Sequence, residues 1–260
     1  MRTALITGAT SGLGRQLAHD LAERDWAVLV HGRDERKVRE VADATGGTAF
    51  VADLASLREV RGLAEEVREA VDRLDVLVNN AGIISAERLL SADGYELTFA
   101  VNYLAGFVLT LELLPLLRAS APARVVNVSS VGQSEVDFAN PMLEHGYSGM
   151  RAYSQSKLAQ ILFTFELAER LSPGEVTVNA LHPATLMDTQ MVRQSFGRTM
   201  STVREGANAT LRLIADPEFD GVSGRYFDGQ AESRADPQAY DADARRRLWE
   251  LSERLARAEG

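Results

Sequence analysis

The stretch Thr7-Gly8-Ala9-Thr10-Ser11-Gly12-Leu13-Gly14 follows a short apolar run and precedes a helical pattern. Its glycines have the spacing G-x-x-x-G-x-G. Because glycine has no Cβ, these positions permit a tight turn and a close approach to a pyrophosphate group. A helix that begins here offers free N–H groups and the positive end of its dipole to phosphate. Such turns also simply pack a helix on a strand, so the place of this turn at the first strand–helix junction is what favours dinucleotide binding.

Outward from this turn, short apolar runs alternate with helical patterns along the chain. Strands are expected at residues 4–6, 27–30, 48–52, 76–78, 125–128, 176–181 and 225–227. Helices are expected from the glycine turn to about residue 24, then over residues 34–45, from residue 56, over 96–118 and over 151–171. Ser56 and Glu59 form a capping-box pattern. This order predicts an α/β fold of the Rossmann type, with a doubly wound parallel sheet of about seven strands and helices on both faces.

Length and composition narrow the class of protein. We expect the 260 residues to form a single domain over 1–260, with a polar C-terminal appendage over about 228–260. The formal net charge of −9 argues against nucleic acid and anionic membranes as partners. The chain has no cysteine, shows no signal-peptide pattern, and has no uninterrupted apolar run near the ~18 residues of a membrane helix. A cytoplasmic location is therefore expected.

The end of the second predicted strand bears on the choice of nicotinamide. NAD sites usually place an acidic residue about 20 positions after the glycine turn, on the ribose 2′-hydroxyl. Here Arg33 lies 19 positions after Gly14, and a guanidinium suits a 2′-phosphate better. Arg15 and Arg36 are possible helpers, whereas Asp34 leaves NAD open as the alternative. NADP(H) is the preferred interpretation.

Tyr153 and Lys157 stand at positions i and i+4 of a predicted helix, so their side chains share one face. An unperturbed tyrosine titrates near 10, and a nearby ammonium lowers that pKa. Such a pair can exchange a proton with an alcohol or carbonyl oxygen. Alone, the spacing is common by chance, and a pair on a surface helix is its default interpretation.

Further motifs lie at the ends of the predicted strands. They are Asp53-Leu54, Asn79-Asn80-Ala81-Gly82 and Asn127-Val128-Ser129-Ser130, with Asn102 in the long helix. Together with the glycine turn and Tyr-x-x-x-Lys, they resemble the short-chain dehydrogenase/reductase family from residue 4 to about 227. The sequence around these motifs is most similar to that of retinol-dehydrogenase-type members.

This resemblance implies roles for individual residues. Tyr153 would be the acid/base, Lys157 would bind the nicotinamide ribose and lower the tyrosine pKa, and Ser130 would hydrogen-bond the substrate oxygen. Asn102 would hold a water molecule of a proton relay. The catalytic set is therefore Asn102, Ser130, Tyr153 and Lys157. The expected cofactor-binding residues are Gly8, Thr10, Ser11, Gly12, Leu13, Gly14, Arg33, Asp53, Leu54, Asn80, Ala81, Gly82, Tyr153, Lys157, Pro183 and Thr189.

The segment after the sixth predicted strand departs from the family pattern. Ala184 stands where the family more often has glycine, and either Asp188 or Thr189 is expected to contact the nicotinamide amide. Residues 185–202 would form the substrate lid. Four histidines, His19, His31, His145 and His182, show no metal-ligand spacing, so no metal is expected.

Apolar side chains dominate both flanks of the expected substrate pocket. They are Leu186, Met187, Met191, Val192, Phe196 and Met200 on the lid, and Val131, Phe138, Met142, Leu143 and Met150 opposite. The same flanks carry the charges Glu135, Asp137, Glu144, Arg151, Asp188 and Arg193, so an arrangement with the charges in the pocket is the alternative.

We therefore expect an NADP(H)-dependent carbonyl reductase or alcohol dehydrogenase that acts on a medium-sized, largely apolar ketone or aldehyde, or on the corresponding alcohol, and not on a sugar or a small hydroxy acid. The alternatives are an NAD(H)-dependent dehydrogenase of the same type and a non-catalytic NADP-binding regulator. Pairing of two chains through the long helices is a further possibility, as in many members of the family.

Overall fold

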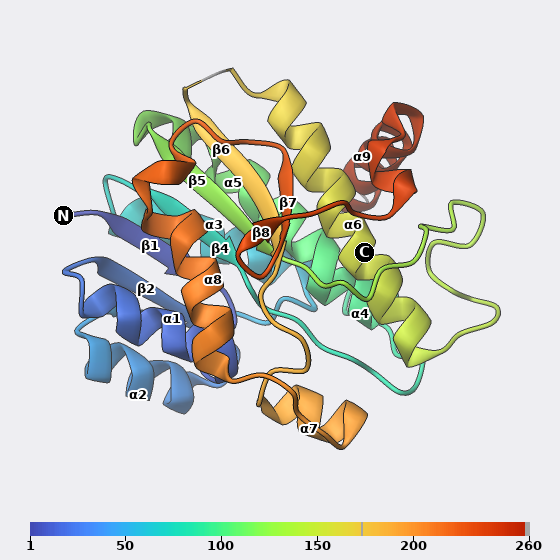
Figure 1. Ribbon diagram of the computed structural model, residues 1–260, viewed down its shortest axis with the longest axis horizontal. Helices are drawn as coiled ribbons and strands as arrows, with labels where there is room; N and C mark the ends of the chain where they lie inside the picture. The colour runs from blue at the N-terminus through green and yellow to red at the C-terminus, as the bar shows by residue number, and fades with distance from the viewer. Residues whose placement is uncertain (173, 258–260) are drawn as a thin grey trace.

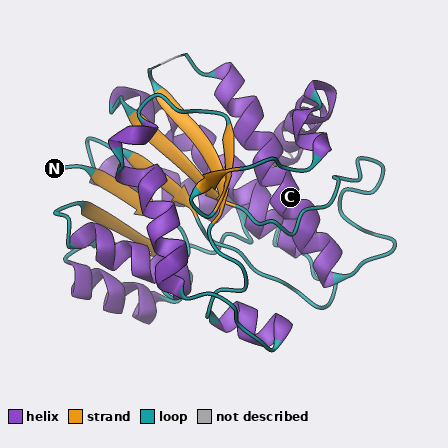
Figure 2. Cartoon of the chain, viewed as in Figure 1, coloured by secondary structure: helices purple, strands orange, loops and turns teal. Residues whose placement is uncertain are grey.

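A computed structural model describes residues 1–172 and 174–257. Within them, one sheet has the strand order β3-β2-β1-β4-β5-β6-β7-β8 (Figures 1 and 2). The strands are β1 (Thr3–Ile6), β2 (Ala27–Gly32), β3 (Thr48–Val51), β4 (Val76–Asn79), β5 (Ala123–Val128), β6 (Val176–His182), β7 (Arg225–Asp228) and β8 (Ala231–Glu232). The first seven strands are parallel, which confirms the predicted doubly wound fold. The short β8 pairs antiparallel with β7 and was not predicted.

Helices cover both faces of the sheet. One face carries α1 (Gly12–Ala22), α2 (Glu35–Thr45) and α8 (Val203–Ala215). The other face carries α3 (Leu57–Ala70), α5 (Ala105–Ala119), α6 (Gly149–Arg170) and α9 (Ala242–Arg257). Successive strand residues alternate between the two cores, so that Leu5 faces α5 while Ile6 faces α1. A strand between two covered faces is largely apolar, as residues 76–78 are throughout.

The predicted helix over residues 96–118 is a composite. It runs through α4 (Leu97–Phe99), a π-helical turn (Ala100–Leu104) and α5. The Glu96 carboxylate accepts hydrogen bonds from the backbone N–H groups of Thr98 and Phe99 at 2.9 and 2.7 Å and caps the start. π-Helical turns recur at functional sites, and this one contains Asn102.

The same composite helix corrects the expectation about apolar runs. Leu97–Ala119 spans 23 residues and contains an 18-residue window with a mean hydropathy of 1.7, so by length and composition it could cross a membrane. Of that window, 61% is buried inside the protein. Its buried side chains pack in the main core with those of α3 and α6.

The C-terminal region differs from the polar appendage that we expected. Its last helix, α9, packs against α6 and belongs to the main core (Figure 1). The Trp249 ring lies 5.2 Å from that of Phe107 and 6.1 Å from that of Phe163, and Ser252 hydrogen-bonds Tyr103 at 2.7 Å. This helix thus covers the outer side of α5 and α6, the helices considered for pairing. The final residues of the expected appendage, 258–260, lie outside the described residues.

The capping box predicted at α3 forms only in part. Ser56 accepts a hydrogen bond from the Glu59 N–H at 3.3 Å, as predicted. The Glu59 carboxylate instead accepts from the backbone N–H of Asp53 at 2.7 Å. In a complete capping box, the Glu59 carboxylate would accept from the Ser56 N–H. Here the Asp53 N–H, which belongs to the preceding loop, takes that place.

Candidate functional site

The predicted site residues gather where the parallel strands end. β1, β4, β5 and β6 lead into the glycine turn, Asn80-Ala81-Gly82, Ser129-Ser130 and Pro183, respectively. The strand order reverses direction between β1 and β4. In open α/β sheets, ligands bind in the crevice outside this switch point.

The glycine turn is fixed by close backbone contacts. Gly8 and Gly12 have φ angles of +65° and +51°, which favour glycine. A Cβ on Gly14 would lie 2.4 Å from the Gly8 carbonyl oxygen, and one on Gly8 would lie 2.9 Å from the Ala81 Cα. The turn therefore leads directly into α1, whose N-terminus can face a phosphate group, and this arrangement fits a dinucleotide.

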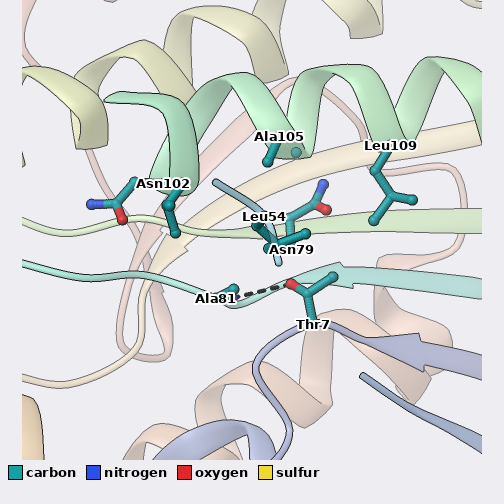
Figure 3. A pocket seen from close by; sticks show the side chains of 9 residues that line it. Thr7, Leu54, Asn79, Ala81, Asn102, Ala105 and Leu109 are labelled. Atoms are coloured by element: carbon teal, nitrogen blue, oxygen red, sulfur yellow. Dashed lines mark hydrogen bonds between the residues drawn. The ribbon is translucent and has the colours of Figure 1, made fainter. Parts of the chain in front are cut away.

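Thr7 and Asn80 connect the turn to β4. The Thr7 hydroxyl accepts hydrogen bonds from the N–H groups of Asn80 and Ala81 at 3.0 and 3.1 Å, the second of which Figure 3 shows. The Asn80 amide donates back to the Thr7 and Gly8 carbonyls at 2.8 and 3.3 Å. The Asn80 side chain thus holds the glycine turn in place through these hydrogen bonds, while Ala81 and Gly82 line the cleft beside the turn.

His31 is a supporting residue that the sequence did not reveal. It is buried at the end of β2, where its Nδ1 accepts from the Gly8 N–H at 3.4 Å and its Nε2 donates to the Ala52 carbonyl at 3.2 Å. Burial lowers the pKa of His31 to about 4, so the ring is neutral at physiological pH. The histidine therefore ties the glycine turn to the segment after β3.

The residues after β2 lie in different environments. A Cβ on Gly32 would lie 2.6 Å from Thr10 Cγ2, so this part of the turn packs over the strand end. Arg33 is exposed. Asp34 accepts from the Lys37 N–H at 3.1 Å and caps α2, and its ion pair with Lys37 spans 3.7 Å.

The arginines considered for binding a 2′-phosphate differ in their ion-pair partners. Arg36 forms an ion pair with Glu40. Among the residues that the structure describes, neither Arg15 nor Arg33 pairs with a carboxylate. These two guanidinium groups therefore remain available for an anionic ligand.

Asp53 and Leu54 follow β3 on the same edge of the sheet. The Asp53 carboxylate accepts from the Ala55 N–H at 2.9 Å, which shapes the turn before α3. Leu54 is buried and lies in the main core. The pair can close the adenine side of the crevice, with Leu54 as an apolar wall.

Tyr153 and Ser130 meet across the crevice. Ser130 lies close enough to the Tyr153 phenol to act on its ionisation, and the Ser130 hydroxyl accepts a hydrogen bond from the Gly132 N–H at 3.0 Å. The neighbouring Ser129 hydroxyl instead donates to the Lys157 carbonyl at 2.7 Å. Only the second serine of the pair therefore faces the tyrosine, which matches the choice made from the family pattern.

Burial raises the pKa of Tyr153 above its usual value, and the hydrogen bond from Ser130 opposes that shift. The Lys157 Nζ lies 5.5 Å from the centre of the tyrosine ring. The pKa of Tyr153 is thus raised and not lowered as expected from the sequence, because burial is the largest influence on it and Ser130 opposes burial only in part. A neutral phenol at physiological pH suits the donation of a proton.

Asn102 lies on the π-helical turn, and its amide is bonded on both sides. Its Oδ1 accepts from the Ile83 N–H at 2.7 Å, and its Nδ2 donates to the Ile83 carbonyl and the Ser156 hydroxyl, both at 3.0 Å. Asn102 thereby joins the segment after Gly82 to α6, next to Lys157. Its expected role in holding a water molecule stays a prediction.

The lid contains one short helix, α7 (Gln190–Phe196), which lies apart from the rest of the molecule in Figure 1. Thr189 caps α7, and its Cγ2 lies 3.0 Å from where a Cβ on Gly12 would be. Asp188 is exposed and paired with Arg193 at 2.6 Å. Of the two candidates left open by the sequence, Thr189 is therefore the one beside the glycine turn.

The flank opposite the lid is less apolar than expected. Leu143 is fully buried, and Phe138 and Met142 pack against the main core. Val131 and Met150 remain exposed. Three of the five apolar residues assigned to this side of the pocket are thus core residues, because the loop folds back on α6.

A small cavity lies between β4 and the composite helix (Figure 3). Its volume is about 10 Å³, enough for about one water molecule and far too small for a dinucleotide. The Asn79 side chain on its wall donates to Thr110 and Asn127 at 3.0 and 2.8 Å. Among the described residues, no group of three or more histidine, aspartate or glutamate side chains is placed to hold a metal ion.

Comparison with known proteins agrees with this geometry. A family model for short chain dehydrogenases matches residues 2–199. Retinol dehydrogenase 14 of Mus musculus is 39% identical, over 97% of this chain and 85% of the mouse protein. Polyprenol dehydrogenase of Mus musculus is 37% identical, over 100% of this chain and 85% of the mouse protein.

Two solved structures are similar as well. A protein from Mycobacterium paratuberculosis has a TM-score of 0.82 at 33% identity, and the match covers 100% of this chain and 94% of that one. A short chain dehydrogenase from Escherichia coli CFT073, complexed with NADPH, has a TM-score of 0.73 at 27% identity, with coverage of 88% and 97%.

Proposed function

The chain belongs to the short-chain dehydrogenase/reductase family, and on that premise we propose that it is an NADP(H)-dependent oxidoreductase that interconverts an apolar aldehyde or ketone and its alcohol. The observation that carries the chemistry is that Ser130, Tyr153 and the buried Lys157 are brought together, with the Lys157 Nζ 5.5 Å from the centre of the tyrosine ring. A non-catalytic binding protein would have no need of this arrangement. The cytoplasmic location expected from the sequence stays a prediction.

In the reducing direction, the nicotinamide supplies a hydride to the carbonyl carbon. The Ser130 hydroxyl and the Tyr153 hydroxyl both bond the carbonyl oxygen, and Tyr153 transfers its proton to that oxygen. The positive charge of Lys157 stabilises the phenolate that remains. In the oxidising direction, the phenolate takes the proton back from the alcohol.

Arg33 supports the choice of NADP(H). Arg33 is exposed directly after β2 and, within the described residues, has no carboxylate partner. Asp34, the residue that would favour NAD, is engaged in capping α2. A planar guanidinium can bind two oxygens of a phosphate group at once. The related Escherichia coli structure with NADPH bound agrees with this preference.

The relatives support an apolar substrate. Retinol and polyprenol, from which two of them take their names, are both apolar alcohols. In this chain, four apolar side chains are exposed on the two flanks of the site. They are Val131, Met150, Phe196 and Met200.

The test is a fluorescence titration of NADPH and NADH with wild type and Arg33→Ala. Loss of a charge-assisted hydrogen bond costs about 1.5–3 kcal/mol, so we expect NADPH to bind roughly ten- to a hundredfold more weakly to the variant. NADH affinity should stay unchanged. Arg39→Ala is the matched control, because Arg39 is an exposed arginine of α2 that pairs with Glu35 and has no expected role in cofactor binding.

Equal NADPH affinity in wild type and Arg33→Ala would remove Arg33 from this role. The activity itself is tested with a panel of ketones and aldehydes and both cofactors. A protein that binds NADPH and turns over none of them would be the binding regulator instead.

A further inference from the structure

Lys157 is a buried cation with two hydrogen-bond partners among the residues that the structure describes. Its side chain is 4% exposed. The Nζ donates to the Val128 carbonyl at 2.8 Å and to Gln160 Oε1 at 3.0 Å. Removing an ammonium group from water is costly unless acceptors replace the water, so these two oxygens matter for its charge.

Gln160 has no place in the family motifs that identify the site. It lies on α6, three residues after Lys157, and is itself 4% exposed. Because an ammonium group only donates hydrogen bonds, the glutamine must present its carbonyl oxygen here. Two of the three N–H groups of Lys157 are thereby held on the β5 and α6 side.

The remaining N–H faces the crevice. The Lys157 Nζ lies 3.6 Å from where a Cβ on Gly82 would be, and Asn102 Oδ1 lies at the same distance from that point. Gly82 thus leaves open space in front of the ammonium. With Val128 and Gln160 behind it, the group is aimed at the cleft in which Tyr153 lies.

We infer that Gln160 is a positioning residue of the catalytic pair, whose side-chain carbonyl keeps the Lys157 ammonium charged and directed into the cleft. The catalytic meaning of this contact rests on the proposed function. The contact itself belongs to the protein without any ligand, so it can be tested apart from turnover.

Other titratable groups near Lys157 do not replace this contact. Tyr153 is on the same helix, and His182 at the end of β6 is close enough for the lysine charge to lower the pKa of the histidine further. Tyr226 and Asp228 belong to β7, and the Asp228 carboxylate acts to raise the pKa of both His182 and Tyr226. No carboxylate among the described residues hydrogen-bonds Lys157, and burial lowers its pKa to about 7.

The composition of the chain makes a direct measurement possible. Only two of its 28 basic residues are lysines, Lys37 and Lys157. Lys37 is half exposed on α2, with a side-chain exposure of 50%. In protein labelled with ¹³C-lysine, the two side chains give two Cε signals, which Lys37→Arg assigns. Lys37 then serves as an internal reference in every pH titration.

The experiment compares Gln160→Leu, Gln160→Glu and the matched control Gln155→Leu. Gln155 is a buried glutamine on the same helix that instead bonds Asp137 and Pro141. Loss of the acceptor in Gln160→Leu should lower the titration midpoint of Lys157 by about one pH unit, a tenfold loss in proton affinity. The carboxylate of Gln160→Glu should raise the midpoint by about one unit or more. Gln155→Leu should leave it in place.

The inference is overturned if the Lys157 midpoint is the same in wild type and both Gln160 variants. If Gln160→Leu fails to fold, Gln160→Glu still decides, because the carboxylate has almost the same shape as the amide. A protein that shows both shifts but reduces no carbonyl compound would refute the proposed function and leave the contact established. In an active enzyme, the pH profile of kcat/KM should move in the same direction as the Lys157 midpoint.

Discussion

The two walls of the crevice are built in opposite ways. On the α6 wall, Ser129, Ser130, Asn102 and Lys157 are all buried and hydrogen-bonded. On the lid wall, residues 193–200 are all exposed. The lid makes contacts at its ends, where Met187 forms a β-bridge with Ser201 and Thr189 lies beside Gly12 of the glycine turn.

This contrast suits two different tasks, proton transfer on the α6 wall and substrate binding on the lid. Groups that transfer a proton must be held within a fraction of an ångström, and dense packing with satisfied hydrogen bonds does that. A wall that touches only the substrate can be loosely packed, since its contribution is apolar contact. Changes on the α6 wall should therefore alter rate and stability, and changes on the lid should alter substrate binding.

The sharpest test of this division is Tyr153→Phe, which removes one hydroxyl from the α6 wall. General acid–base groups contribute about 10²–10⁴ in rate, so we expect kcat to fall by that factor while NADPH binding stays within about twofold. Steady-state kinetics and a cofactor titration measure the two effects. Substantial turnover in the variant would mean that another group donates the proton, and the assignment of Tyr153 would fail.

A second test compares two phenylalanines, one from each wall. Phe163 on α6 is 3% exposed, with its ring 5.3 Å from that of Phe107, whereas Phe196 on α7 is 38% exposed. Phe163→Ala should lower the free energy of unfolding by about 3–5 kcal/mol. Phe196→Ala should change it by less than about 0.5 kcal/mol. Urea unfolding of both variants measures the difference, and equal losses would show that the lid is as firmly packed as the core.

The order of strands and helices was predictable because each buried strand has a short apolar run and each helix a repeating apolar face. The proximity of Tyr153 and Lys157 was predictable because they are one helical turn apart, and their catalytic role stays a prediction. Family resemblance singled out Ser130, and the structure places it beside Tyr153. Local spacing and strand-end position carry this information in the sequence itself.

Contacts between distant segments were not predictable in this way. Glu59 bonds Asp53 because a loop donor is nearer than the one in its motif. Helix α9 looks polar because arginines and glutamates surround the few apolar residues, such as Leu248 and Trp249, that it buries. His31 acts through partners 21 and 23 residues away, and no motif marks it. Gln160 is close to Lys157 in the sequence, but no motif marks it either.

The smallest expected effect comes from the exposed end of the lid. Phe196 and Met200 remain 38% and 66% exposed. If a substrate covers roughly 50 Å² of one such side chain, the contact is worth about 1.2 kcal/mol at ~25 cal/mol per Å². Replacing either residue with serine should therefore raise KM for a long-chain or aryl aldehyde by about three- to tenfold.

Because this contact is the same in the ground state and the transition state, kcat should be unchanged. A polar sugar aldehyde should be a poor substrate for wild type, and its kinetics should not respond to either change. Arg198→Ser is the matched control, because Arg198 is an exposed residue of the same segment without an apolar surface to lose. If wild type prefers the sugar aldehyde, the lid does not select apolar substrates, although the division between a rigid catalytic wall and a loosely packed lid would still stand.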